Sequence, residues 1–271
     1  MKIAGIQFAC SESKEANIEK ALKIMDVALK EGARIICFQE MFNQCWFPKG
    51  RNENAFLLAD DIKNRIVGIF KKKAKTADAV ILLPIFEKVR SHFFNSCVVI
   101  NADGKISGTY RKIHIPDIPL WEEKYYFSTG NKGLPVFNTN HGRLGVQISW
   151  DNLYPESTRV LALKGAEIVF SPTACAFKTQ HIWQTVISGN AITNGLYIMR
   201  INRVGSEDAL DFYGMSFCVN PEGELIGGPT GAVDSILLAD IDFEYLKHIR
   251  REWPLMKERK PKFYKEIIKG A

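Results

Sequence analysis

Three polar residues could perform acyl-transfer chemistry together. Glu40, Lys112 and Ser149 each end or follow an apolar run that predicts a β-strand. A carboxylate can act as a base, an ammonium can stabilise developing negative charge, and a hydroxyl can attack a carbonyl carbon. Each residue also has a structural explanation as a turn cap, a surface charge or a turn hydroxyl. Pattern alone leaves both interpretations open.

The position of Ser149 favours a role as nucleophile. Residues 145–156 read Gly-Val-Gln-Ile-Ser-Trp-Asp-Asn-Leu-Tyr-Pro-Glu and predict a strand that turns into a helix opening at Pro155. The turn would hold Ser149 at the carboxyl end of a strand, where open α/β sheets bind ligands. We expect the N–H groups of Trp150 and Asp151 to lie unpaired beside it, as acyl transfer requires. The alternative is an ordinary strand-to-helix turn.

Other motifs carry less chemistry. The chain has no G-x-S-x-G, P-loop, G-x-G-x-x-G or H-E-x-x-H motif. Its five histidines lack metal-ligand spacing, and we expect His114 and His181 to stabilise loops rather than to react. The six cysteines form no C-x-x-C motif and several lie in apolar runs, which indicates reduced thiols in a cytoplasmic protein.

The composition is that of a globular protein. The chain has 271 residues, is 46% hydrophobic and carries a net charge of +6. No apolar run reaches the length of a membrane span and no signal peptide is visible, so we expect no membrane association. The basic runs at residues 71–75 and 257–269 lack a recognisable nucleic-acid module, so we expect solvated helix faces and no nucleic-acid partner.

Helices alternate with strands throughout the chain, which favours a pair of mixed sheets covered by helices. Residues 32–40 and 165–173 share a Gly-Ala, strand, polar-end pattern, which suggests two similar halves. We expect one domain over residues 1–271, with 250–271 a tail anchored by Trp253, Phe263 and Tyr264. The expected helices are residues 15–30, 60–77, 155–164, 180–194 and 243–250. The expected strands are residues 2–8, 34–38, 79–86, 94–101, 106–112, 136–139, 143–148, 166–170, 196–201 and 235–241, with a further hairpin across 221–223.

Four motifs resemble those of the nitrilase superfamily of carbon–nitrogen hydrolases. They are Phe38-Gln-Glu40-Met-Phe, Tyr110-Arg-Lys112-Ile-His-Ile-Pro-Asp, Glu123-Lys-Tyr-Tyr-Phe and the segment 145–156. Their order is that of the family, with 72 residues from Glu40 to Lys112 and 37 from Lys112 to position 149. Residues 165–173, 201–205 and 212–216 extend the similarity over nearly the whole chain.

The resemblance implies a fold and a set of roles. The fold is an α-β-β-α sandwich of two mixed sheets with pseudo-two-fold halves, assembled as homo-oligomers (dimers or larger), without a cofactor or a metal. Glu40 would be the general base, Lys112 the oxyanion stabiliser, Glu123 a second carboxylate and position 149 the nucleophile. The resemblance further suggests the Trp150 amide as an oxyanion donor and Tyr125 and Thr173 as substrate-binding residues.

Position 149 departs from the family, in which it is cysteine. A thiol with a pKa near 8.5 can lose its proton to a carboxylate whose pKa is raised by burial, whereas a serine hydroxyl is far less acidic. We therefore expect attack on an amide to slow by orders of magnitude while substrate still binds. Either the residue is an engineered Cys→Ser change or a natural member has lost its nucleophile. We favour the engineered form because Glu40, Lys112 and Glu123 still fit the family pattern.

The resemblance points to the branch that hydrolyses small N-carbamoyl amines or N-carbamoyl amino acids. An ω-amidase or aliphatic amidase of the same superfamily, or a non-catalytic ligand-binding protein, remains an alternative. An acidic pocket residue would suit an amine at the far end of the substrate, and an arginine would suit a carboxylate. We expect residues 43–49 and 178–183 to rim the pocket, and neither Cys45 nor Cys175 to reach the Glu40–Lys112 pair.

Overall fold

The strands carry apolar side chains on both of their faces, which explains why each sheet is covered on two sides. In β2 (Ile35–Phe38), Ile35 and Cys37 pack into the core between the two sheets, whereas Ile36 and Phe38 pack into the core beneath the outer helices. Successive side chains of a strand point to opposite faces, so such a strand needs cover on both sides. The structure is a computed structural model that describes residues 1–176 and 180–269.

The first sheet has the strand order β14-β1-β2-β3-β4-β5. Strands β1, β2 and β3 run parallel, and β14, β4 and β5 join them by antiparallel pairing. The bounds are β1 Lys2–Gln7, β3 Val80–Val89, β4 His92–Ile100, β5 Ile106–Arg111 and β14 Ser235–Asp240.

The second sheet repeats this arrangement, in the order β13-β12-β9-β8-β7-β6. Its three central strands β7, β8 and β9 are parallel, with β6 antiparallel on one side and β12 and β13 antiparallel on the other. The bounds are β6 Phe137–Thr139, β7 Gly142–Val146, β8 Ile168–Pro172, β9 Tyr197–Ile201, β12 Phe217–Val219 and β13 Leu225–Gly227. The equal strand patterns agree with the prediction of two similar halves.

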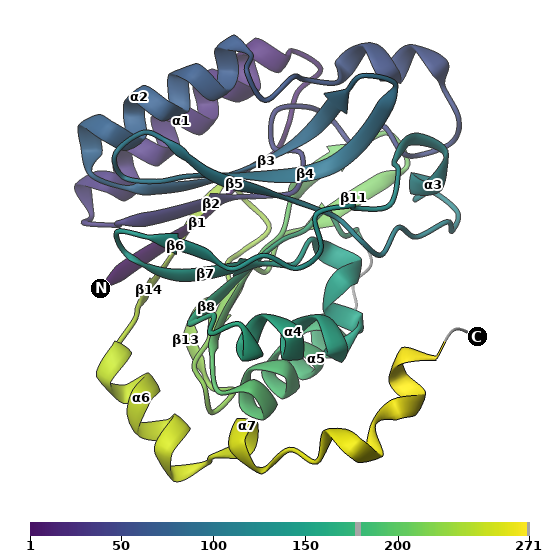
Figure 1. Cartoon of the computed structure of the whole chain (residues 1–271). Helices are drawn as coiled ribbons and strands as arrows, with labels where there is room; N and C mark the ends of the chain where they lie inside the picture. Colours follow the sequence, from purple (N-terminus) through teal and green to yellow (C-terminus); the bar gives the residue numbers. More distant parts are fainter. Residues whose placement is uncertain (177–179, 270–271) are drawn as a thin grey trace.

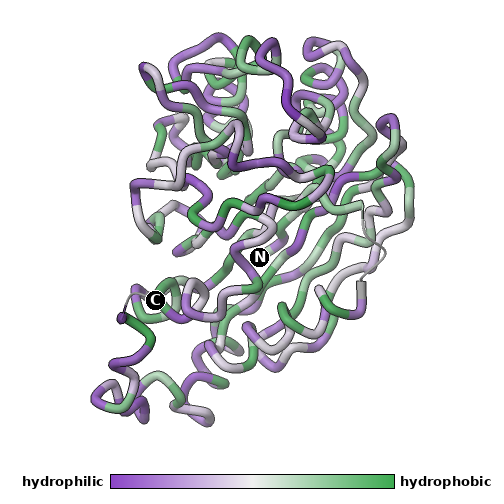
Figure 2. Tube along the Cα trace, turned by 90° about the vertical axis from the view of Figure 1, so that its right-hand side faces the viewer, coloured by the Kyte–Doolittle hydropathy of each residue, from purple (hydrophilic) through white to green (hydrophobic). Residues whose placement is uncertain are grey.

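Helices cover both outer faces and complete an α-β-β-α sandwich (Figure 1). Helices α1 (Lys14–Lys30) and α2 (Arg65–Ala77) lie on the first sheet, and α4 (Pro155–Leu163) and α5 (Gln180–Asn194) lie on the second. Figure 2 shows hydrophobic stretches along the stacked strands and hydrophilic stretches in the outer loops and the C-terminal segment. The shorter elements are η1 Glu53–Leu58, α3 Glu123–Tyr126, η2 Ser149–Leu153, β10 Val204–Glu207, β11 Leu210–Tyr213, α6 Phe243–Glu252, α7 Leu255–Glu258, η3 Pro261–Phe263 and η4 Lys265–Ile268.

Several local predictions need correction. Helix α2 begins at Arg65 rather than at residue 60, because the Asn64 side chain caps it by accepting a hydrogen bond from the Val67 N–H. The hairpin of β10 and β11 was not predicted. The C-terminal segment is not anchored as expected, since Trp253 and Phe263 are 64% and 71% exposed.

Candidate active site

Lys112 lies between two buried carboxylates. Its Nζ is 3.1 Å from Oε1 of Glu40 and 2.9 and 2.7 Å from the two carboxylate oxygens of Glu123. All three side chains are almost fully buried. A buried ammonium needs counter-charges and a buried carboxylate needs donors, and this trio supplies both.

Sheet topology explains why residues so distant in sequence meet. Strand β2 is parallel to β3, and β5 has the same direction because two antiparallel pairings separate it from β3. Glu40, two residues beyond β2, and Lys112, directly after β5, therefore emerge at the same edge of the sheet. Glu123 is the first residue of α3, which follows in the chain. The sequence prediction that strand ends would bring Glu40 and Lys112 together agrees with this geometry.

The Glu40 carboxylate is fixed by two further donors. Its Oε1 accepts a hydrogen bond from Asn95 Nδ2 at 2.7 Å, and its Oε2 accepts one from the Ala174 N–H at 2.7 Å. Asn95 belongs to the first sheet and Ala174 follows β8 of the second, so the carboxylate bridges the two sheets. Sequence reasoning missed Asn95, although a buried amide within an apolar strand is a signal for such a role.

Burial and neighbouring charges shift the pKa values of Lys112 and Glu123. Burial lowers the pKa of Lys112, but the charges of Glu123 and Glu40 outweigh it and hold the pKa above its ordinary value. Burial raises the pKa of Glu123; the Lys112 charge opposes this, and the Glu40 charge adds to it. Lys112 thus remains an ammonium, and Glu123 is the carboxyl that takes up a proton more readily than usual.

Ser149 opens the one-turn helix η2 in a rare backbone conformation. Its φ is 45°, in the left-handed region that residues other than glycine seldom adopt and that is over-represented at functional sites. Asp151 holds the turn, because its Oδ2 accepts hydrogen bonds from the Ile148 N–H at 2.9 Å and the Tyr110 hydroxyl at 2.6 Å. Its Oδ1 lies 2.8 Å from Nδ1 of His114, which agrees with the expected loop-stabilising role of that histidine.

One of the two expected backbone donors beside Ser149 is already used. The Asp151 N–H donates to the Ile148 carbonyl at 3.1 Å, so the prediction that it is unpaired was wrong. Trp150 is the second residue of the turn, where a helical N–H has no acceptor within its own helix. Its N–H is therefore the donor that a developing oxyanion could use.

Ser149 and Glu123 line a narrow cleft. Its volume is about 20 Å³, which is room for about one water molecule. The other lining residues are Pro116, Ile118, Trp121, Trp150, Ala174, Cys175 and Trp183. Two of the residues that line the cleft contact the Lys112–Glu40 pair directly: Glu123 accepts a hydrogen bond from Lys112, and the Ala174 N–H donates to Glu40.

The remaining predicted site residues have mixed positions. Tyr125 is half-buried and packs against Phe56 and Tyr126, outside the residues that line the cleft. Thr173 is fully buried, and its hydroxyl donates to the Ser171 carbonyl.

Of the two segments predicted to rim the pocket, only residues 178–183 contribute a lining residue among those described. None of residues 43–49 is among the lining residues, whereas Trp183 is. Lys178 lies outside the described residues. Cys175 lines the cleft together with Ser149. That neither Cys45 nor Cys175 reaches the Glu40–Lys112 pair stays a prediction.

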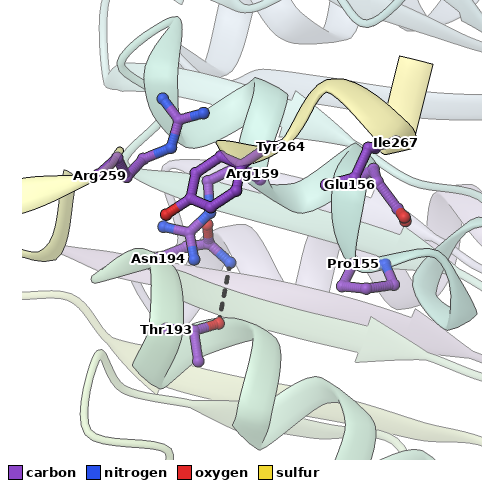
Figure 3. A pocket seen from close by; sticks show the side chains of 8 residues that line it. All are labelled: Pro155, Glu156, Arg159, Thr193, Asn194, Arg259, Tyr264 and Ile267. Carbon is purple, nitrogen blue, oxygen red and sulfur yellow. Dashed lines mark hydrogen bonds between the residues drawn. The ribbon is translucent and has the colours of Figure 1, made fainter. Parts of the chain in front are cut away.

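A larger cavity lies elsewhere and lacks this chemistry. Its volume is about 260 Å³, and its lining residues come from α4, α5 and the C-terminal segment (Figure 3). The hydroxyl of Thr193, which lines this cavity, donates to the Gly189 carbonyl within α5. It has Arg159 and Arg259 but no lysine between carboxylates, so the narrow cleft is the better candidate.

Within residues 1–176 and 180–269, no helix is long and apolar enough to cross a membrane. The same ranges contain no group of three or more His, Cys, Asp and Glu side chains arranged to hold a metal ion.

Comparisons with known proteins agree with the fold and the motifs. Residues 2–251 match the carbon-nitrogen hydrolase family. N-carbamoylputrescine amidase of Arabidopsis thaliana is 34% identical over 98% of this chain and 94% of its own length, and citrullinase of Francisella tularensis is 36% identical over 99% and 98%. The crystal structure of a carbon-nitrogen hydrolase from Helicobacter pylori G27 covers 99% of both chains with a TM-score of 0.94 and 34% identity. The chain thus belongs to the carbon–nitrogen hydrolase family, within the nitrilase superfamily that its motifs resemble.

Proposed function

We propose that this protein hydrolyses the terminal ureido group of a small N-carbamoyl amine or N-carbamoyl amino acid. The observation that carries the proposal is the buried Glu40–Lys112–Glu123 trio, whose Glu123 lines the same cleft as Ser149. The relatives named for N-carbamoylputrescine and citrulline hydrolysis support this substrate class. The net reaction adds one water to the ureido group and releases carbon dioxide, ammonia and the free amine.

The proposed mechanism uses the geometry of the cleft. The side chain at position 149 attacks the ureido carbonyl while Glu40 accepts its proton. The Lys112 ammonium and the Trp150 N–H stabilise the resulting oxyanion. Collapse of the intermediate expels a nitrogen leaving group, which takes the proton from Glu40, and leaves an acyl-enzyme. Water then attacks that acyl group, with Glu40 or Glu123 as the base. The bond to the side chain at position 149 breaks, that side chain takes the proton back, and the released carbamic acid decomposes to carbon dioxide and the second nitrogen product.

Serine at position 149 limits the first step. A hydroxyl offers far less anion to a carboxylate base than a thiol does, and no histidine side chain is among the described residues that line the cleft. We therefore propose that this form binds substrate and turns it over slowly.

The test is the variant Ser149→Cys. We expect it to raise ammonia release from a panel of N-carbamoyl amines and amino acids by at least about 100-fold over the Ser149 protein. Ser149→Ala serves as the matched control without a nucleophile and should fall to background. Background rates in the Ser149→Cys form with every ureido compound would refute the proposal.

Ser149 also favours a second candidate, a protein that binds ureido compounds without hydrolysing them. Calorimetry separates the two candidates. Micromolar binding of a ureido compound together with no turnover in either the Ser149 or the Ser149→Cys form would support the binding protein and reject the hydrolase.

We also propose that the protein forms a homo-oligomer. Apolar side chains on the outer surface of the second half are exposed, among them Leu163 of α4, Ile192 of α5, and Phe263 and Ile268 of the C-terminal segment. Such surfaces often mark protein–protein contacts. Light scattering coupled to size exclusion should give a mass of at least two chains, and a monomeric mass at micromolar concentration would refute this proposal.

A further inference from the structure

Arg200 and Arg203 are both fully buried and lie three positions apart, but their hydrogen-bond partners differ. Arg203 donates to Glu207 at 2.6 Å and to the carbonyls of three other residues, Glu40, Met41 and Gln44. Arg200, on β9, donates from Nη2 to the Tyr213 hydroxyl at 3.1 Å. Its Nε and Nη1 have no hydrogen-bond partner in the described part of the chain.

In residues 1–176 and 180–269, no acidic side chain pairs with the Arg200 guanidinium. Nε and Nη1 carry three of the five N–H groups of a guanidinium. Removing such a charge from water is unfavourable unless an opposite charge and acceptors replace the water. Aromatic faces compensate only in part: the guanidinium carbon lies 5.1 Å from the ring centre of Trp183 and 5.7 Å from that of Tyr213.

Arg200 is directly behind the wall of the catalytic cleft. Trp183, which stacks on the guanidinium, lines that cleft together with Ser149. Trp183 and Tyr213 also form one apolar cluster with Cys175, another lining residue. Arg200 pairs in the sheet with Ser171, whose hydroxyl accepts from the same Asn152 amide that holds the Ser149 carbonyl.

We propose that Arg200, with Tyr213 and Trp183, forms a subsite for a carboxylate at the far end of the substrate. The missing anion is then supplied by the ligand, and the preferred substrates are N-carbamoyl amino acids rather than N-carbamoyl amines. Trp183 contacts both the cleft and the guanidinium, so its ring is the side chain that moves when the carboxylate binds. This inference rests on the proposed ureido hydrolysis and narrows its substrate class.

The test compares two ureido compounds of similar size that differ in the charge of the far end. The probes are 4-ureidobutyrate, which ends in a carboxylate, and 4-ureidobutylamine, which ends in an ammonium. Calorimetry on the unaltered protein, in which turnover is slow, should give at least about tenfold tighter binding of 4-ureidobutyrate. This comparison needs no variant and therefore does not depend on the folding of one.

Variants then assign the preference to Arg200. Arg200→Gln should weaken binding of 4-ureidobutyrate by about 10- to 100-fold and change that of 4-ureidobutylamine by less than about threefold. Arg159→Gln, which removes a half-buried arginine away from the cleft, is the matched control and should keep the preference. Thermal unfolding checks each fold, and Arg200→Lys provides a second variant that keeps the charge but loses the planar donor group.

The outcomes are separable. Preference for 4-ureidobutylamine, or equal binding of both probes in the unaltered protein, would overturn the carboxylate subsite and leave the hydrolase proposal intact. An equal loss of affinity for both probes in a folded Arg200→Gln protein would assign Arg200 a structural role and also overturn it. Absence of binding by either probe would contradict the proposed function itself.

Discussion

Replacing Lys112 with methionine is expected to destabilise the protein, and more strongly at pH 9.5 than at pH 7. Methionine keeps the length of the side chain but removes the ammonium that contacts both Glu40 and Glu123. Removing one partner of a buried ion pair costs about 3–5 kcal/mol, because the remaining charge is left unpaired. The two carboxylates that Lys112 contacts put this variant at the upper part of that range at pH 9.5.

The pH dependence follows from Glu123. Burial raises its pKa, the Lys112 charge lowers it, and the Glu40 charge raises it. Loss of Lys112 removes the lowering cause, so the pKa in the folded protein rises further. A carboxyl with a raised folded pKa binds more protons in the folded state, so stability falls as pH rises from about 4.3 through the folded value. In the unaltered protein this loss ends near a folded pKa of about 8, whereas in the variant it continues to higher pH. Each further pH unit there removes up to about 1.4 kcal/mol from the variant alone.

Urea unfolding at pH 7 and pH 9.5 measures the effect. We expect the loss in free energy of unfolding to be about 1–2 kcal/mol greater at pH 9.5 than at pH 7. Lys105→Met is the matched control: its side chain is 86% exposed, and its removal should change stability by less than about 0.5 kcal/mol at both pH values. Equal losses at the two pH values for Lys112→Met would refute the reasoning about the trio.

Two further predictions concern Asp151 and Arg203, which form hydrogen bonds to the backbone next to Ser149 and at Glu40. Asp151→Asn removes the charged acceptor shared by the Ile148 N–H and the Tyr110 hydroxyl, so it should lower stability by about 1–3 kcal/mol. It should also lower turnover by the Ser149→Cys form more than tenfold, and unchanged ammonia release would argue against the turn as the nucleophile's support. Arg203→Met leaves the Glu207 carboxylate buried without its cation and should lower the free energy of unfolding by about 3–5 kcal/mol in a urea titration. A loss below about 1 kcal/mol would show that water replaces the guanidinium there.

Local patterns were sufficient for most of the secondary structure. The predicted helix at residues 180–194 matches α5 (Gln180–Asn194), and the Asp-Gly hairpin joins β4 and β5 as expected. The pattern failed at the start of α2. The Asn64 side chain caps the helix, and Asp60 lies before it with its carboxylate in contact with Lys14 and Asn43.

The sequence predicts the charged residues of the candidate site, but it does not predict the groups that fix Glu40 by hydrogen bonds. Glu40, Lys112 and Glu123 carry motif signals, and their order along the chain matches the family. Asn95 and the Ala174 N–H, which fix Glu40, come from strands of different sheets. No local pattern encodes that contact, because it depends on how the two sheets stack.

The sequence by itself determined the alternation that buries both faces of each sheet, the two similar halves and the identity of the candidate site residues. Only the tertiary structure decided which charges meet. It places Lys112 between two carboxylates and removes the Arg200 guanidinium from water with no acidic partner in the part of the chain that the structure describes. The physical reason is that burial and pairing of a charge depend on neighbours distant in sequence, whereas strand and helix patterns depend on residues close by.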